Sequence, residues 1–122
     1  MEYIEEFTLR EKNFIYIDLS GVKSNYDFCK RVGAIMPVIE KYPLNSLYTI
    51  TNVENTRFDS ESKNSLRDYL KHNSLYVKYG TVIGMDGIKK IMAKSMFQVA
   101  GRTNMHFAFT KEQAIEWLMK QD

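Results

Sequence analysis

Few residues of this 122-residue chain have the types and spacing that catalysis or metal binding requires. The chain has one cysteine, Cys29, and two histidines, His72 and His106. It contains no H-E-x-x-H pattern and no C-x-x-C pair, so it carries no recognisable zinc site. It also has no G-x-S-x-G elbow to expose a nucleophilic serine, and no Walker phosphate loop. We therefore predict a domain that is not an enzyme and needs neither a cofactor nor a metal.

The cysteine and both histidines have structural interpretations. Cys29 falls at the edge of the buried face of a predicted helix, where a small side chain fits. His72 falls at the end of another predicted helix, where the helix dipole favours a cation. His106 falls inside a predicted strand, as a core or edge histidine. None of the three needs a chemical role to explain its position.

A glycine-flanked turn at residues 84–87 (GMDG) is the first candidate binding site. It connects a predicted strand to a predicted helix, and the backbone N–H groups at a helix N-terminus can hold an anion. In the alternative interpretation the glycines supply unusual backbone angles and the aspartate caps the helix. The candidate ligand-binding residues here are Gly84, Asp86, Gly87 and Lys89.

Asp59 and Ser60 form the second candidate site, at the start of a helix predicted to end at His72 and Asn73. Either side chain could cap the helix by accepting a hydrogen bond from a free N–H group of the first turn. Ser60 could instead carry a phosphate, because a helix N-terminus tolerates negative charge. We predict that one of the two is the N-cap and keep phosphorylation of Ser60 as the alternative.

The helix after the glycine-flanked turn carries the third candidate site. At about 100° per residue, one side of this helix is predicted to face inward and holds Ile88, Ile91, Met92, Ser95, Met96 and Val99. The other side holds Lys90, Ala93, Lys94 and Phe97, and the ring of Phe97 would gain from burial against a partner. We predict an interface there, formed by Lys90, Lys94 and Phe97. It would meet a protein partner or the acidic N-terminal strand of a second copy, around Glu2, Glu5 and Glu6; the alternative places Phe97 in the core.

The elements that must position these residues alternate between strand and helix. The predicted order is ββαβαβαβα, which indicates an α/β domain with a mostly parallel five-stranded sheet and four helices. The first strand is predicted to be antiparallel to the rest, after a short polar break. Gly101 is predicted to end the third helix and Thr110 to begin the fourth, through a capping box with Gln113. The predicted strands cover residues 3–9, 14–19, 46–53, 76–83 and 104–109.

Composition narrows the classes of partner. The length predicts one domain over residues 1–122, and a net charge of +2 from 17 basic and 15 acidic residues argues against nucleic acid. No apolar run approaches the ~20 residues of a membrane span, so we predict no membrane insertion. A lone cysteine suits a reducing compartment, which predicts a cytoplasmic protein.

Several segments of the chain resemble a known family. They are residues 15–21 (IYIDLSG), 72–92 (HNSLYVKYGTVIGMDGIKKIM) and 100–102 (AGR), followed by Phe107, Ala114 and the Trp117–Leu118 pair. Together with the order of elements, they resemble the STAS superfamily, and within it the SpoIIAA-like branch, whose fold CRAL-TRIO lipid-binding domains share. The resemblance implies a regulatory, non-catalytic domain. Anti-sigma-factor antagonists of this superfamily carry a phosphorylatable serine where Ser60 falls, but Glu61-Ser62-Lys63 replaces their usual continuation.

We therefore predict a domain that binds a protein partner or a second copy of itself. The alternative is a domain that binds a small molecule or lipid, near residues 84–87 or between a helix and the sheet. An apolar cavity of a few hundred Å³ lined by Met36, Met92 or Met96 would favour the ligand. An exposed apolar patch would favour the protein partner.

Overall fold

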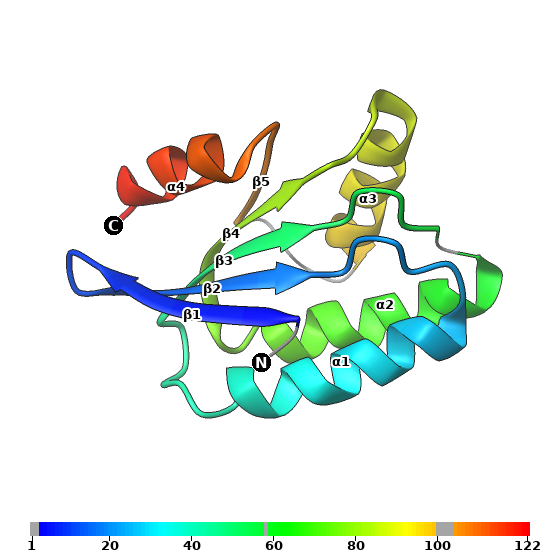
Figure 1. Ribbon diagram of the computed structural model, residues 1–122, viewed down its shortest axis with the longest axis horizontal. Helices are drawn as coiled ribbons and strands as arrows, with labels where there is room; N and C mark the ends of the chain where they lie inside the picture. Colours follow the sequence, from blue (N-terminus) through cyan, green and yellow to red (C-terminus); the bar gives the residue numbers. More distant parts are fainter. Residues whose placement is uncertain (1–2, 58, 100–103) are drawn as a thin grey trace.

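A five-stranded sheet with helices on both faces forms the frame of the protein (Figure 1). The computed structural model describes residues 3–57, 59–99 and 104–122, without the side chains of residues 88, 89, 92, 96, 97 and 99. The predicted order ββαβαβαβα is confirmed. The elements are β1 (Ile4–Leu9), β2 (Lys12–Asp18), α1 (Asn25–Ile39), β3 (Leu47–Asn52), α2 (Ser60–Asn73), β4 (Val77–Ile83), α3 (Gly87–Val99), β5 (Met105–Ala108) and α4 (Lys111–Met119).

The sheet is mixed, with strands in the order β1-β2-β3-β4-β5. The first strand, β1, is antiparallel to β2, as predicted, and the three other neighbouring pairs are parallel. A mixed sheet corrects our expectation of a mostly parallel one. The cause is a two-residue hairpin turn at Arg10 and Glu11, which have φ angles of 49° and 68°. Two positive φ angles match the twist of antiparallel strands, so this turn returns the chain beside β1 without a crossover helix.

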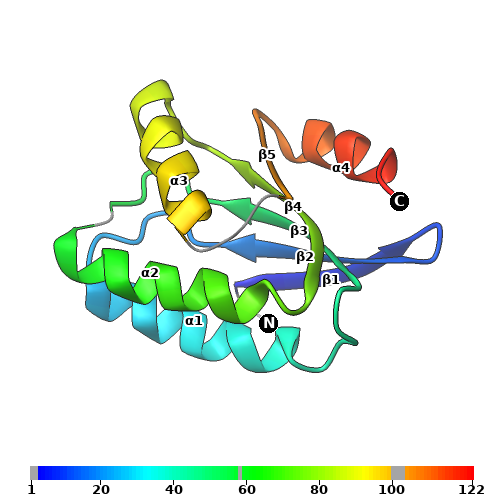
Figure 2. The same ribbon diagram turned by 180° about the vertical axis from the view of Figure 1, so that it is seen from behind.

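The remaining crossovers put three helices on one face. Each crossover leads to the next strand in the same direction, and right-handed crossovers then place α1, α2 and α3 on the same side of the sheet. The last helix, α4, follows β5 and packs on β3, β4 and β5 from the opposite side (Figures 1 and 2). We call the side under α1–α3 the closed face and the side under α4 the open face.

Both faces have an apolar core, and the larger one lies between the closed face and its helices. Its fully buried residues include Ile15 and Ile17 of β2 and Phe28 and Ile35 of α1. The core of the open face is built on Phe14, Tyr48 and Ile50, under Ala114 and Leu118 of α4. Alternate residues of β2 therefore enter different cores, as the period of a strand requires.

The predicted ends of the helices have mixed outcomes. Thr110 is the N-cap of α4, with its side chain accepting a hydrogen bond from the Gln113 N–H at 3.1 Å. The Gln113 amide oxygen in turn accepts a hydrogen bond from the Phe109 N–H at 3.1 Å. The second hydrogen bond of the capping box therefore comes from the residue before the N-cap and not from Thr110 itself. The first helix, which the pattern of apolar residues predicts over residues 25–42, ends at Ile39. The predicted end of α3 at Gly101 lies outside the described residues.

Candidate functional site

Asp59 is the N-cap of α2, and this settles the capping alternative. Its Oδ1 atom accepts hydrogen bonds from the N–H and the hydroxyl of Ser62, both at 2.9 Å. The bond from the Ser62 N–H is the main reason that the pKa of the Asp59 carboxyl lies below its ordinary value. Ser60 is the first residue of α2 and is exposed. Its hydroxyl is not part of the cap, and its phosphorylation stays a prediction.

Gly84 is required by the packing of the turn at residues 84–87. Its φ angle is 87°, and a Cβ atom there would lie 2.7 Å from the backbone nitrogen of Glu54 and 2.9 Å from Oδ1 of Asn52. Gly87 has open space around it and begins α3, while the Asp86 carbonyl accepts the first helical hydrogen bond from the Lys90 N–H at 2.9 Å. These contacts favour the structural interpretation of the turn.

The sheet topology also argues against an anion site at this turn. Open α/β sheets bind ligands in a crevice where the strand order reverses, and this sheet has no reversal. The first residues after β2 and β3 are instead hydrogen-bonded to the last residues of the neighbouring strands. The Leu19 N–H donates to the Asn52 carbonyl at 2.8 Å, and the Val53 N–H donates to the Ile83 carbonyl at 3.0 Å. Anion binding at residues 84–87 stays a prediction that the geometry disfavours.

The outward face of α3 differs from its prediction. Ile91, predicted to face inward, is 72% exposed, whereas Ala93, predicted to face outward, packs against the larger core. The side chains of Phe97 and Lys89 lie outside the described residues. The periodicity was wrong at Ile91 and Ala93, because apolar residues lie on both sides of this helix. Its described contacts are with α2, with β5 and with the residue after β5.

The lysines of α3 lie over aromatic rings. The Nζ atom of Lys90 is 4.7 Å from the ring centroid of Phe109, and that of Lys94 is 5.8 Å from the ring centroid of Phe107. Such contacts between a cation and a ring are favourable, although Lys94 is exposed and the ring of Phe109 is 77% exposed. The predicted interface of Lys90, Lys94 and Phe97 stays a prediction.

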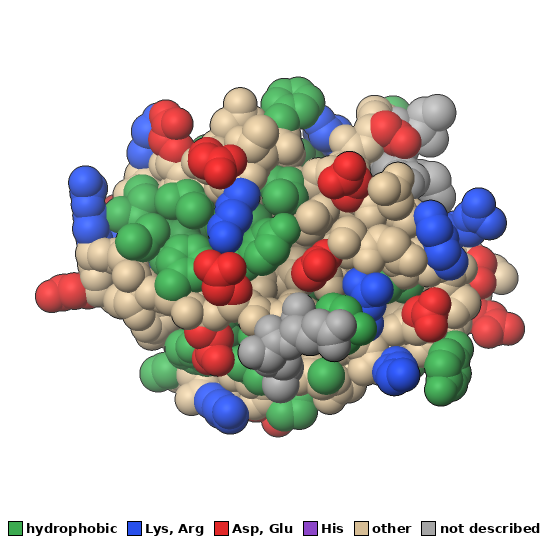
Figure 3. All heavy atoms as spheres, in the orientation of Figure 1, with side chains coloured by type: hydrophobic (Ala, Val, Ile, Leu, Met, Phe, Trp, Pro, Cys, Tyr) green, Lys and Arg blue, Asp and Glu red, His purple; other side chains and the backbone are tan. Residues whose placement is uncertain are grey.

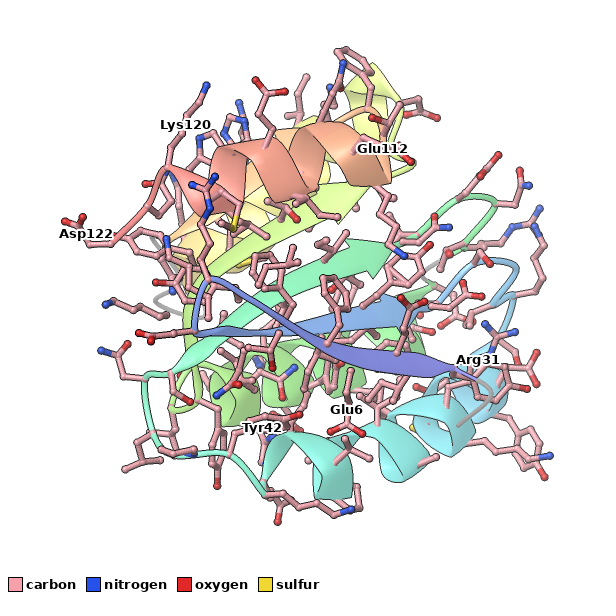
Figure 4. All side chains as sticks on the ribbon, turned by 60° about the vertical axis from the view of Figure 1, so that its left-hand side comes forward. Glu6, Arg31, Tyr42, Glu112, Lys120 and Asp122 are labelled. Atoms are coloured by element: carbon pink, nitrogen blue, oxygen red, sulfur yellow. The ribbon has the colours of Figure 1, made fainter. Side chains whose placement is uncertain are left out.

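The acidic residues of β1 also have partners within the chain. The Glu5 carboxylate lies 3.4 Å from Nζ of Lys111. Oε1 of Glu6 accepts a hydrogen bond from the Tyr42 hydroxyl at 2.6 Å (Figure 4). Burial, aided by this bond to Glu6, raises the pKa of Tyr42 to about 12. Residue 2 lies outside the described part of the chain. The two described acids thus contact α4 and the turn that follows α1.

The cysteine and the histidines are separated in space as well as in sequence. Cys29 is exposed, with its sulfur 3.5 Å from the Ser65 hydroxyl oxygen. His72 links α2 to α1, because its Nε2 lies 3.1 Å from Oε1 of Glu40. His106 stacks on Trp117 at 4.4 Å between ring centroids, and burial lowers its pKa. Within the described ranges, no three His, Cys, Asp or Glu side chains group as a metal site would need.

An aromatic row on the open face is the feature that sequence reasoning missed. Ring centroids are 5.1 Å apart between Phe7 and Phe14, 5.6 Å between Phe14 and Tyr48, and 6.1 Å between Tyr48 and Tyr79. The row therefore crosses four strands, and Trp117 of α4 continues it 6.0 Å from Tyr79. A signal was present, since each of the first four strands carries an aromatic residue. The sequence could not show that these residues share one face.

The helix over this row is fixed at both of its ends to the first two strands. Nζ of Lys12, in β2, donates hydrogen bonds to the carbonyls of Met119, at 3.3 Å, and Gln121. At the other end Lys111 is paired with Glu5 and lies over two rings, 5.7 Å from the centroid of Phe7 and 4.7 Å from that of Tyr16. Cations are favoured at a helix C-terminus, so Lys12 suits its position.

One flank of α4 continues into an apolar surface on β1 and β2. Ile115 and Met119 follow Lys111 at four-residue spacing and so lie on the side of α4 that Lys111 turns toward Phe7 and Tyr16. Figure 3 shows hydrophobic side chains gathered in this region, crossed by a basic side chain and bordered by acidic ones. Leu9, 37% exposed, extends the surface along β1. We call it the α4-flank surface, formed by Phe7, Leu9, Tyr16, Ile115 and Met119.

An apolar cavity lies on the closed face, between the sheet, α2 and α3. Its volume is about 50 Å³, and its lining includes Leu66, Leu70, Val82, Met85 and Met105. Met85 belongs to the glycine-flanked turn, so the cavity reaches the place where we predicted a ligand. It is smaller than the few hundred Å³ we set as the criterion. Of the three methionines named for it, Met36 is not among the described lining residues, and the side chains of Met92 and Met96 are outside the described part.

Comparisons with known proteins assign no family to this fold. No protein-family model matches the chain, and neither the curated proteins nor the solved structures that were searched give a match. In the described part of the chain, no helix combines the length and the apolar character needed to cross a membrane.

Proposed function

We propose that this chain is a non-catalytic domain that acts by binding a protein through the α4-flank surface. The observation that carries the proposal is the unequal covering of the sheet. Three helices lie over the closed face, whereas a single nine-residue helix packs on β3, β4 and β5 of the open face. Phe7 of β1 and Tyr16 of β2 are therefore only half-buried.

The physical argument concerns β2 and its neighbours. Strands in parallel pairs are usually buried on both faces, and Phe14 of β2 is fully buried while Tyr16 is only half-buried. Aromatic residues and methionine are enriched in the buried parts of protein interfaces. The surface presents side chains of both kinds, with Lys111 and Glu5 among them. A protein that covers β1 and β2 would complete the second layer of the fold.

The resemblance to the STAS superfamily supports the same proposal, because its regulatory members work by binding other proteins. We propose together that the chain belongs to that superfamily, that it binds a partner without catalysing a reaction, and that it is cytoplasmic. The lone cysteine, which suits a reducing compartment, is consistent with the location.

The test compares two glutamate substitutions in the source cells. Ile115→Glu puts a charge in the α4-flank surface, whereas Ile91→Glu puts the same charge on α3, where the side chain is already 72% exposed. A protein that co-purifies with the wild type and with Ile91→Glu should be lost with Ile115→Glu. The recovered protein should then bind the purified wild-type and Ile91→Glu domains equally well and bind the Ile115→Glu domain more weakly. Equal recovery with both variants would contradict the proposal.

A second candidate function is the binding of a small apolar molecule, and the 50 Å³ cavity is the observation that favours it. An engineered cavity of about 150 Å³ binds benzene, so this one would admit only the narrow end of a ligand. Octanoate is a suitable probe. Its titration should shift NMR signals of Leu70, Val82 and Met105, and Ala93→Phe, which fills the cavity, should abolish the shifts. Shifts confined to the α4-flank surface, or none, would exclude this candidate.

A further inference from the structure

The attachment of α4 to the open face is shallower than that of α1 to the closed face. Five residues of α1 are buried, whereas α4 buries only Ala114 and Leu118 of its nine residues. Its other apolar residues, Ile115, Trp117 and Met119, are half-buried. Because most of the stability of a helix in a protein comes from packing of its apolar face, α4 loses less than α1 would on leaving the sheet.

The length of α4 ties its helical structure to its docking. An isolated helix in water is marginal below about 12–15 residues, and α4 has nine. The helix therefore unfolds when it leaves the sheet. It is either docked and formed or released and unfolded, which makes it a small cooperative unit within the domain.

Polar contacts at the two ends of α4 add to its docking. Lys12 donates hydrogen bonds to the carbonyls of Met119 and Gln121, and these bonds are half-buried. At the other end Lys111 pairs with Glu5, with side chains 33% and 59% exposed. Exposed ion pairs contribute little to stability and are weakened by salt. The Lys12 bonds, whose donor is charged, are therefore the stronger of the two attachments.

Release of α4 would leave the sheet beneath it in place. The three strands under the helix are paired with one another, and β3 is also paired with β2. Phe14 and Tyr48 belong to the core that α4 completes and would lose part of their cover. Trp117 would leave the rings of Tyr79 and His106, which lie 6.0 Å and 4.4 Å from it between centroids. Release would thus turn the core of the open face into an apolar surface.

We infer that α4 is a detachable cover of the open face, which opens and closes while the rest of the domain stays folded. The closed form is the one described above, and the Lys12 bonds hold it closed. The proposed function concerns only this closed form, and release of α4 is a property beyond it. A protein bound to the α4-flank surface touches α4 and the first two strands together, so it would hold the helix closed.

Native-state hydrogen exchange of the full chain, followed by NMR over a series of low urea concentrations, gives the first test. The amides of Ala114 and Leu118 should be at least about tenfold less protected from exchange than those of Ile17 in β2 and Ile50 in β3. Their exchange should also respond more weakly to urea, because release of one helix exposes little surface. A difference below about tenfold, or the same urea response at all four amides, would overturn the inference.

Two substitutions separate release of α4 from unfolding of the domain. Lys12→Met removes bonds that only the closed form makes, and should lower the protection of the α4 amides about three- to tenfold. Ile35→Val removes a buried methyl group from α1, whose packing the open and closed forms share. It should lower the protection of Ile50 about three- to tenfold and leave that of α4 unchanged.

The variants can contradict the inference in two ways. If Ile35→Val lowers the protection of α4 as much as that of Ile50, the helix opens only with the whole domain and is not a detachable cover. If the protection of α4 is unchanged in Lys12→Met, the apolar contacts alone hold the helix closed and the role given to Lys12 is wrong.

Discussion

The two faces of the sheet differ in the chemistry of their side chains. In β2 the residues toward the closed face are Ile15 and Ile17, while those toward the open face are Phe14 and Tyr16. Branched aliphatic side chains pack closely against helices, and three helices cover the closed face. Aromatic rings stack across strands and tolerate partial contact with water, since a tyrosine has an apolar body and a polar tip. The comparison indicates that the closed face is built for stability and that the open face is suited to contact.

The largest expected effect tests this comparison directly, with one phenylalanine on each face. Phe28→Ala, in α1, removes a fully buried ring that packs edge-on against Tyr69 at 5.9 Å, and should lower the free energy of unfolding by about 3–5 kcal/mol. Phe7→Ala, on the open face, removes a half-buried ring and should cost about 1 kcal/mol. Urea denaturation at low protein concentration measures both. Equal losses would mean that the open face is packed as tightly as the closed one.

The second prediction concerns the turn between β4 and α3, on the side of the closed face. Gly84→Ala forces a Cβ atom against the Glu54 backbone at a positive φ angle, and should cost about 1–3 kcal/mol of unfolding free energy. Gly87→Ala is the matched control, because it has open space and sits at the start of a helix. Alanine should be neutral or slightly stabilising there. If Gly84→Ala were as harmless as its control, the turn would not depend on this packing.

The sequence was informative where a local signal decides the structure. Asp59 and Thr110 cap their helices because a side-chain acceptor beside free N–H groups is a contact within three residues. The order of the elements follows from hydrophobic periods in the same way. Arg10 and Glu11 were predicted to lie in a polar break at residues 10–13, short enough to make a hairpin, and the hairpin is confirmed. Neither residue signals the positive φ angles it adopts.

Features that depend on distant segments could not be predicted. The orientation of α3 depends on its packing against α2 and on its contacts with Phe107 and Phe109, because its own apolar residues allow two orientations. The α4-flank surface joins residues about a hundred positions apart, since Lys111 meets Glu5 and Lys12 meets the end of α4. The sequence contains these residues but does not indicate which of them lie on the same face of the sheet. The α4-flank surface, which is the candidate site that the fold supports best, could therefore not be predicted from the sequence.

A smaller effect is expected at the β1–β2 hairpin, whose strands carry part of the α4-flank surface. Arg10 and Glu11 both occupy the left-handed region, which costs a residue with a Cβ about 1–2 kcal/mol. Replacing the pair with Asn-Gly relieves much of this cost, although glycine loses more entropy on folding. We expect a net gain of about 0.5–1 kcal/mol in unfolding free energy, measured by urea denaturation. An Ala-Ala replacement removes the same charges without the conformational freedom and should give no gain; a gain equal to that of Asn-Gly would assign the effect to charge.

The smallest effect concerns pH and the start of α2 on the closed face. The pKa of Asp59 is lowered in the folded protein by its bonds from Ser62, so the ionised cap stabilises the fold above the ordinary Asp pKa of 3.8. That contribution falls away as the pH drops through 3.8 toward the lower folded value. Asp59→Asn keeps an oxygen acceptor for the Ser62 N–H but cannot ionise. The wild type should therefore lose more unfolding free energy than Asp59→Asn between pH 7 and pH 3 in denaturant titrations. Parallel loss in the two proteins would show that the charge at this cap adds nothing to the stability of the closed face, and that its hydrogen-bond geometry alone holds the helix end.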